Sequence, residues 1–238
     1  MTALLATEGL NKHFGALHAT RNVTFALEEG ARHALIGPNG AGKTTLFSII
    51  SGFAAPTEGR IAYRGSDITG RPPHLLARQG IARTFQIVQP FPRMSVLENV
   101  AAAALFGGKQ ESVAAAMEVA REQLEFTGLT GFADRPASAL TLAGRKRLEL
   151  AKSMATSPKV LMLDEVNAGL NSGEIDGALK LIRQIAERGV TILIIEHLMK
   201  VVLSLAQRVL VLLDGTRVPP TASSVPLLRR GAFASAAR

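Results

Sequence analysis

The amino-acid sequence predicts an α/β fold: a mainly parallel β-sheet with helices on both faces and an inserted helical lobe. Short apolar runs of strand length alternate with helical patterns along most of the chain. These runs are apolar throughout, which is typical of strands that are buried on both faces of a parallel sheet. A segment near residues 90–157 departs from the alternation, because it consists of consecutive Ala-rich helical patterns with no convincing strand between them.

The expected elements follow in chain order. Strands are predicted at Arg21–Leu27, Arg32–Ile36, Lys159–Leu163, Val190–Ile195 and Arg208–Leu213. Helices, in which apolar residues recur at helical spacing, are predicted at Gly42–Ile50, Val96–Leu105, Ser112–Thr127, Gly144–Ala155, Glu174–Glu187 and Leu198–Ala206. We therefore expect a core in two parts, residues 1–89 and 158–217, with the helical lobe at 90–157 between them. Residues 218–238 lack periodicity, and we expect them to form an atypical, loosely ordered tail.

Composition excludes several classes of protein. With 238 residues, 47% of them hydrophobic and 19% charged, the chain can bury a core and is not globally disordered. The absence of Cys excludes disulfide scaffolds, thiolate zinc sites, iron–sulfur clusters and cysteine nucleophiles. The longest apolar stretches, such as Thr191–Ile195, are far shorter than the ~20 residues that cross a bilayer. Residues Met1–Glu8 lack the features of a secretion signal, so we expect a cytoplasmic protein.

The net charge of +8 raises the alternative of a nucleic-acid or anionic membrane partner. No acidic residue follows Asp214, whereas four arginines do: Arg217, Arg229, Arg230 and Arg238. Half of the excess charge therefore belongs to the last stretch of the chain, and the remainder is only mildly basic. This distribution weakens the nucleic-acid alternative.

The strongest motif is Gly37–Thr44, whose sequence GPNGAGKT fits G-x-x-x-x-G-K-[ST]. An apolar strand precedes it and a helical pattern follows it, which is the context of a phosphate-binding loop. Its glycines let successive backbone N–H groups point at phosphate oxygens, and the helix adds the positive end of its dipole. We expect Lys43 to reach the β and γ phosphates of a bound nucleotide, and Thr44 to bind Mg²⁺. The residues assigned to the nucleotide here are Gly37, Pro38, Asn39, Gly40, Ala41, Gly42, Lys43, Thr44 and Thr45.

A second motif, Val160–Glu165, is an apolar run that ends in two acidic residues. A phosphate-binding loop needs a metal-binding carboxylate at the end of a neighbouring strand, so we expect Asp164 to hold Mg²⁺ through water. Glu165 lies one residue farther on, where it can orient or deprotonate the water that attacks the γ phosphate. The alternative, a strand that ends at solvent in unremarkable acids, is disfavoured by the presence of the loop. The two motifs together predict a P-loop NTPase with a RecA-like core.

Further segments, in the order and spacing expected around these motifs, make the chain resemble an ABC-transporter ATPase subunit. Gln86, in Arg-Thr-Phe-Gln, resembles the Q-loop glutamine that touches the metal or water. His197 resembles the switch histidine that contacts the γ phosphate, and Ala168–Asn171 resembles the D-loop that crosses to the partner protomer. Phe14 stands where the family stacks an aromatic ring on adenine. The resemblance implies the following roles: Glu165, His197 and Gln86 catalytic; Thr44, Gln86 and Asp164 on Mg²⁺.

The signature motif of the family is the least regular match. Leu140–Gly144 occupies the place where Leu-Ser-Gly-Gly-Gln is usual, so that Thr141 keeps a hydroxyl but Ala143 replaces a glycine. The resemblance implies that Thr141, Ala143 and Gly144 face the γ phosphate bound by the other protomer. Residues 145–147, Arg-Lys-Arg, either support that phosphate electrostatically or form a solvated helix face, and we favour the solvated face.

The resemblance extends from about residue 4 to residue 215 and is greatest to the ATP-binding proteins of branched-chain amino acid importers. Importers of urea and short amides look similar. It implies a peripheral ATPase subunit at the cytoplasmic face of the plasma membrane, with ATP and Mg²⁺ as cofactors and no specific nucleic-acid partner. The implied partners are membrane permease subunits, a second ATPase subunit that is identical or different, and, indirectly, a solute-binding protein.

Two alternatives remain open. The first is a hydrolysis-impaired nucleotide-binding partner subunit, motivated by Ala143, by the unusual tail and by Val166 in place of the proline that normally follows the catalytic glutamate. The second is a soluble ABC-type ATPase that acts on nucleic acid or the ribosome, motivated by the +8 charge. The single phosphate-binding loop speaks against the second alternative, because such proteins usually carry two ATPase halves or extra domains.

Overall fold

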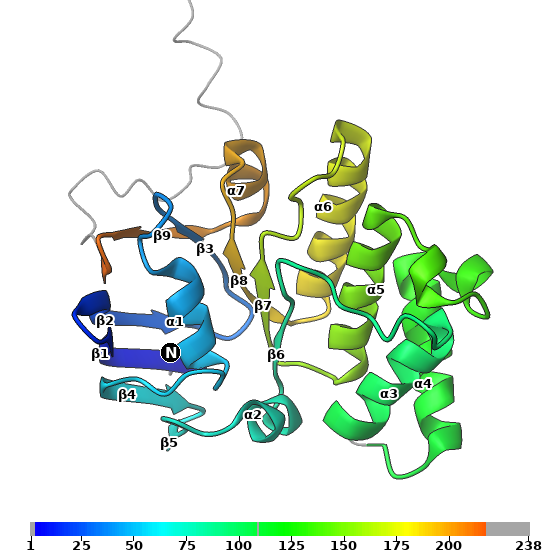
Figure 1. Cartoon of the computed structure of the whole chain (residues 1–238), viewed down its shortest axis with the longest axis horizontal. Coiled ribbons are helices and arrows are strands. Elements are labelled where there is room, and N and C mark those ends of the chain that lie inside the picture. Colours follow the sequence, from blue (N-terminus) through cyan, green and yellow to red (C-terminus); the bar gives the residue numbers. More distant parts are fainter. Residues whose placement is uncertain (1–2, 109, 218–238) are drawn as a thin grey trace, which may run out of the picture.

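A computed structural model describes residues 3–108 and 110–217 (Figure 1). The predicted loosely ordered tail, residues 218–238, lies outside the described residues. The strands are β1 (Leu5–Phe14), β2 (Leu17–Leu27), β3 (Arg32–Ile36), β4 (Glu58–Tyr63), β5 (Ser66–Asp67), β6 (Ile81–Arg83), β7 (Val160–Asp164), β8 (Thr191–Ile195), β9 (Arg208–Leu213) and β10 (Thr216–Arg217). The α-helices are α1 (Lys43–Ile50), α2 (Pro73–Gln79), α3 (Val96–Gly107), α4 (Val113–Thr127), α5 (Leu142–Ala155), α6 (Ser172–Glu187) and α7 (Met199–Leu205).

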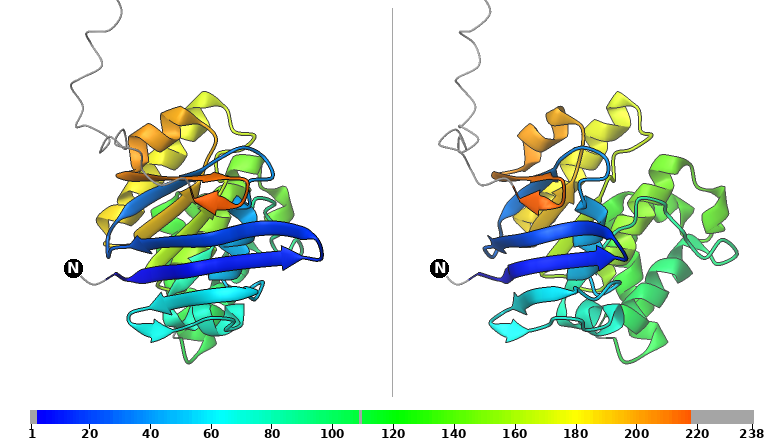
Figure 2. Two further views of the ribbon diagram at one scale, coloured as in Figure 1. Left: turned by 90° about the vertical axis from the view of Figure 1, so that its left-hand side faces the viewer. Right: turned by 60° about the vertical axis from the view of Figure 1, so that its left-hand side comes forward.

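The strands form one sheet whose two halves differ in direction. Within the described residues the strand order is β5-β4-β1-β2-β10-β9-β3-β8-β7-β6. Strands β9, β3, β8, β7 and β6 pair in parallel, whereas β5, β4, β1 and β2 pair antiparallel. Strand β10 connects the halves, parallel to β2 and antiparallel to β9. Figure 2 shows the long antiparallel strands β1 and β2 together on one side of the molecule.

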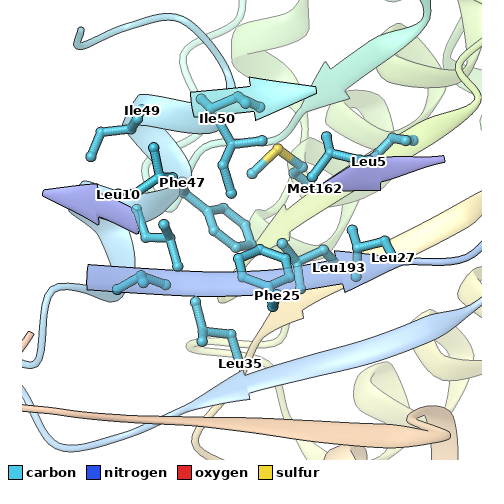
Figure 3. Packing of buried hydrophobic residues seen from close by; sticks show 14 of the residues in the cluster. Leu5, Leu10, Phe25, Leu27, Leu35, Phe47, Ile49, Ile50, Met162 and Leu193 are labelled. Atoms are coloured by element: carbon cyan, nitrogen blue, oxygen red, sulfur yellow. The ribbon is translucent and has the colours of Figure 1, made fainter. Parts of the chain in front are cut away.

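The main core forms around α1, the helix that follows the phosphate-binding loop. Phe47 and Ile50 on this helix are fully buried, and they share one apolar cluster with Phe25 of the antiparallel half and with Met162 and Leu193 of the parallel half (Figure 3). Each such side chain contributes about 1.5–3 kcal/mol through burial. Contacts from both halves of the sheet therefore hold α1, and with it the end of the loop.

The central strands are buried on both faces. Side chains alternate along a strand, so Val160 and Met162 of β7 join the main core, whereas Leu161 and Leu163 join a second cluster with α5, α6 and α7. Every residue of β7 and of β8 is buried. This two-sided burial explains why the sequence of these strands is apolar without alternation.

The inserted helices α3, α4 and α5 have an apolar cluster of their own, and Figures 1 and 2 show them together at the side of the molecule away from β1 and β2. A capping box of Ser95 and Glu98 begins α3. The buried amide of Asn99 accepts a hydrogen bond from the Phe91 backbone N–H at 2.8 Å and donates to the carbonyls of Phe91, Met94 and Ser95 at 3.0, 3.4 and 2.9 Å. These bonds hold the segment that leads into α3 against that helix.

The predicted α/β fold with a mainly parallel sheet and inserted helices is confirmed. The six predicted helices are present, with ends shifted by no more than two residues. The strand predicted at Arg21–Leu27 is present, but it begins at Leu17. Its expected place as a parallel strand buried on both faces is wrong, because it pairs antiparallel with β1 and has one exposed face. Strands β1, β4, β5, β6 and β10 and helix α2 were not predicted. None of the described helices has both the length and the apolar character needed to cross a membrane.

Candidate active site

The predicted phosphate-binding loop connects β3 to α1. Its last glycine, Gly42, has a φ of +87° and directly precedes the helix. A Cβ at this position would lie 2.2 Å from the carbonyl oxygen of Ala19 on β2. The left-handed backbone and the close approach of β2 both require glycine here. The loop is thus fixed between the helix and the antiparallel half of the sheet.

Lys43 lies beneath this loop and is only 6% exposed. Its Nζ donates hydrogen bonds to the carbonyl oxygens of Gly37 at 2.8 Å and Pro38 at 2.9 Å. Burial lowers the pKa of Lys43, while the nearby carboxylates of Glu165 and Asp164 act in the opposite direction. The ammonium group is therefore held inside the loop. The phosphate oxygens of the nucleotide are predicted to bind to the same loop.

A cavity of about 450 Å³ opens beside the loop. It brings together the three residues predicted to hold Mg²⁺, although they come from α1, β7 and the segment after β6. Its lining consists of Thr44, Arg83, Phe85, Gln86, Ile87, Gln89, Glu149, Lys152 and Asp164.

Asp164 ends β7 and is 2% exposed. Its backbone N–H donates to the Thr84 hydroxyl at 3.2 Å, and its Oδ2 accepts a hydrogen bond from Arg83 Nη2 at 2.9 Å. The other carboxylate oxygen, Oδ1, is buried without a hydrogen-bond partner among the described residues. A buried, unpaired carboxylate oxygen is costly. Asp164 and Thr44 line the same cavity, and their carboxylate and hydroxyl oxygens are of the type that Mg²⁺ prefers as ligands.

Glu165 adopts a φ of +48°, which is uncommon for a residue with a side chain. Its backbone is fixed on three sides: its N–H donates to Ile195 O at 3.1 Å, and its carbonyl accepts from the Ala168 N–H and from Lys146 Nζ, both at 3.1 Å. Strain of this kind persists where the surroundings over-determine it and is frequent at functional sites.

The carboxylate of Glu165 is held at both of its oxygens. Gln86 Nε2 donates to Oε2 at 2.7 Å, and His197 Nε2 lies 2.7 Å from Oε1. His197 donates in this contact when its ring proton is on Nε2. The structure thus joins the three residues that the sequence suggested as catalytic. Next to them, Glu196 is buried and accepts a 2.6 Å hydrogen bond from Asn167 Nδ2, and burial raises the pKa of Glu196.

The signature segment and the predicted adenine contact are separate from this cluster. Thr141 caps α5, and its Oγ1 accepts from the Gly144 N–H at 3.2 Å. No hydrogen bond among the described residues joins Thr141, Ala143 or Gly144 to the phosphate-binding loop. Phe14 ends β1 and is 52% exposed. The centroid of its ring lies 5.0 Å from Lys12 Nζ.

The prediction that residues 145–147 form a solvated helix face is wrong for Lys146. Lys146 is 7% exposed, and its Nζ reaches across to the Glu165 carbonyl. Burial lowers its pKa, which the acidic side chains nearby oppose, Glu196 most strongly. Sequence reasoning also missed Arg83 and Asn167. Arg83 stands inside the quoted Q-loop segment, so its charge within an otherwise apolar strand was the available signal.

Comparisons with known proteins identify the family. The family model described as ABC transporter matches residues 20–168. The chain is 41% identical over 237 residues to "High-affinity branched-chain amino acid transport ATP-binding protein BraF" of Pseudomonas aeruginosa, covering 94% of this chain and 92% of that protein. It is 40% identical over 237 residues to "High-affinity branched-chain amino acid transport ATP-binding protein LivG" of Escherichia coli, covering 94% of this chain and 92% of that protein.

Solved structures agree with this assignment. The ADP conformation of MJ1267, an ATP-binding cassette of an ABC transporter, has a TM-score of 0.80 and 32% identity, covering 92% of this chain and 90% of that one. A dimeric post-hydrolysis state of the ATP-binding cassette MJ0796, bound to ADP and Pi, has a TM-score of 0.80 and 25% identity, covering 90% of this chain and 96% of that one. The resemblance inferred from the motifs is confirmed, and the chain belongs to the ABC transporter family of ATP-binding cassettes.

Proposed function

We propose that this chain binds and hydrolyses ATP as the ATPase subunit of an ABC importer for branched-chain amino acids or a related small polar solute. The observation that carries the proposal is the hydrogen bonding of the Glu165 carboxylate by Gln86 and His197 beside the cavity that contains Thr44 and Asp164. A carboxylate oriented in this way can accept a proton from a water molecule that attacks a γ phosphate.

The other residues position the reacting groups. The loop Gly37–Thr44 binds the phosphates through its backbone N–H groups, and Lys43 exchanges its carbonyl contacts for phosphate oxygens. His197 contacts the γ phosphate, and Phe14 stacks on adenine. Phosphoryl transfer asks little covalent chemistry of the protein, so positioning and charge stabilisation account for most of the catalysis.

Thr44, Asp164 and Gln86 are the residues that would hold Mg²⁺. When bound, Mg²⁺ neutralises charge on the β and γ phosphates. The unpaired Oδ1 of Asp164 supports this assignment.

A second ATPase subunit, identical or different, completes each site in this proposal. Thr141 caps α5, Ala143 and Gly144 lie in its first turn, and these residues act on the ATP bound by the other subunit. The dimeric state of the similar cassette supports this arrangement. The subunit acts at the cytoplasmic face of the membrane on permease subunits, and a solute-binding protein contributes indirectly. The two relatives are branched-chain amino acid transport ATP-binding proteins, which supports the branched-chain amino acid assignment.

No observation on the described residues favours the two alternatives. The burial of Val166 in the second apolar cluster, and the hydrogen bonds of the Glu165 backbone to Ile195, Ala168 and Lys146, support a turn that holds Glu165 in place without the usual proline. The described residues likewise contain a complete phosphate loop and an intact pair of acidic residues.

Two substitutions test the proposed ATPase activity. Lys43→Ala should weaken binding of a fluorescent ATP analogue, because the ammonium group inside the loop is lost. Glu165→Gln should leave binding intact and lower the ATP turnover number by about 10²-fold or more, the scale for losing a key catalytic group. Exposed residues provide matched controls: Lys200→Ala and Glu118→Gln should change neither binding nor turnover, since both side chains are well exposed. Near-normal turnover in Glu165→Gln would remove this residue from the catalytic role.

The proposed partners require a separate measurement. A tagged chain, extracted gently with membranes from its native host, should co-purify with hydrophobic permease subunits and an ATPase subunit. Recovery as a free species, or with RNA that dissociates as the salt concentration rises, would instead support the nucleic-acid alternative.

A further inference from the structure

Arg83 is a buried charged residue to which the proposed mechanism assigns no role. It ends β6, three residues before Gln86, and its side chain is 6% exposed. Its Nη2 donates to Asp164 Oδ2 at 2.9 Å. Its Nη1 donates to the hydroxyl of Ser48 on α1 at 3.1 Å and to that of Ser51, the C-cap of α1, at 3.3 Å. One guanidinium group therefore connects β7 with α1.

The contact with α1 continues to the predicted metal-binding threonine. The Ser48 hydroxyl donates to the Thr44 carbonyl oxygen at 2.8 Å while it accepts from Arg83. An unbroken chain of hydrogen bonds thus runs from Thr44 through Ser48 and Arg83 to Asp164. Thr44 on α1 and Asp164 on β7 both line the cavity.

Three aromatic rings surround the guanidinium group. Its Cζ lies 5.2 Å from the ring centroid of Phe85, 5.7 Å from that of Phe47 and 5.9 Å from that of Phe53. These cation–π contacts favour one placement of the guanidinium group among the three rings. A buried ion pair adds little stability compared with apolar side chains of the same size, so the consequence of this pair lies in the geometry that it imposes.

We propose that Arg83 is a positioning residue for the metal site of this ATPase. By occupying Oδ2 of Asp164, it leaves Oδ1 as the carboxylate oxygen that has no hydrogen-bond partner among the described residues. By binding Ser48 and Ser51 with its other amino group, it fixes the separation between Asp164 and Thr44. The inference rests on the proposed function, because it concerns the Mg²⁺ that accompanies ATP.

Lysine cannot replace arginine in this role. The guanidinium presents its donors in a rigid planar fork, so it can bind a carboxylate on one side and two hydroxyls on the other. A lysine ammonium is a single point on a flexible stem, and it can bind Asp164 or the serines but cannot hold both in the same geometry. Arg83→Lys keeps the charge and therefore separates positioning from electrostatics.

The experiment measures Mn²⁺ binding by electron paramagnetic resonance, with and without ADP, in the full chain and its variants. Arg83→Met should raise the Kd for Mn²⁺ in the presence of ADP by about 10-fold or more, the scale for losing a partner that orients a metal ligand. Binding of a fluorescent ADP analogue in EDTA should stay within about twofold of the parent, because the phosphate-loop contacts are unchanged. Arg60→Met is the matched control, since the ion pair of Arg60 with Asp67 is exposed, and it should change neither quantity.

Two milder changes keep the test decisive if Arg83→Met does not fold. Arg83→Lys and the double change Ser48→Ala with Ser51→Ala should each raise the Mn²⁺ Kd by a few-fold. Folded variants that bind Mn²⁺ like the parent, or that lose metal-free ADP binding equally, would overturn the inference. A parent chain that shows no ADP-dependent Mn²⁺ binding would overturn the proposed function as well, so the two failures are distinguishable.

Discussion

Gly42→Ala should destabilise the chain more than Gly40→Ala, although both glycines lie in the phosphate-binding loop. Both have left-handed backbones, with φ of +87° and +82°. Their surroundings differ: a Cβ on Gly42 would lie 2.2 Å from Ala19 O and 3.4 Å from Thr20 Cγ2, whereas a Cβ on Gly40 would meet nothing within 4 Å. The pair therefore separates backbone strain from the contact between the loop and β2.

The magnitudes follow from these two contributions. A left-handed conformation costs an L-residue roughly 1–2 kcal/mol, which is the whole expected loss of stability for Gly40→Ala. Gly42→Ala adds a contact with a backbone oxygen that only a shift of β2 or of the loop can relieve, and such overpacking costs about 1–3 kcal/mol more. For a chain of this length, about 2–4 °C of Tm corresponds to each kcal/mol, so Gly42→Ala should melt about 2–12 °C below Gly40→Ala.

The assay is thermal unfolding without nucleotide, at one scan rate, followed by circular dichroism for the parent and both variants. Omitting nucleotide keeps any change in phosphate binding out of the comparison. If the two variants melt at the same temperature, the close packing of β2 against the loop does not determine the stability of this region, and the reasoning is refuted.

Three further predictions concern buried polar groups. Asn99→Ala should lower the free energy of unfolding by about 2–4 kcal/mol, because it leaves backbone groups such as Phe91 N–H unpaired. Urea denaturation measures this loss, and a loss below about 1 kcal/mol would contradict the prediction. Lys146→Met should lower ATP turnover about 3- to 10-fold with ATP-analogue binding unchanged, because Glu165 loses a contact that fixes its backbone; unchanged turnover would make that contact dispensable. Burial lowers the pKa of His33, so its unfolded state binds the proton more readily, and stability is complete above the ordinary pKa of 6.5 and declines as the pH falls below it. His33→Gln should therefore show a smaller fall in Tm between pH 7.5 and 5.5 than the parent, and parallel falls would exclude His33 as the cause.

The elements that were predicted are those whose signal is local. Strands β7 and β8 appear in the sequence as unbroken apolar runs because both of their faces are buried. Strand β1 was not predicted, because polar residues such as Glu8 and Lys12 interrupt its apolar pattern. A half-exposed antiparallel strand tolerates such residues. Strand β6 is only three residues long and carries Arg83, so it gives almost no periodic signal.

The sequence by itself determined the phosphate-binding loop and the acidic pair at the end of β7, since each depends on residues adjacent in the chain, and it determined the family resemblance through the order and spacing of such short motifs. It also indicated Gln86 and His197 by their order and spacing, but it could not place them on Glu165. Only the tertiary structure showed that Gln86 bonds a carboxylate 79 residues away, and that Arg83 bonds one 81 residues away. Such contacts depend on how parallel strands from distant segments align in the sheet, and residue spacing along the chain does not encode that alignment. The burial of Lys146 has the same origin, because α5 packs against the turn after β7 and thereby converts an apparently solvated cation into a buried donor.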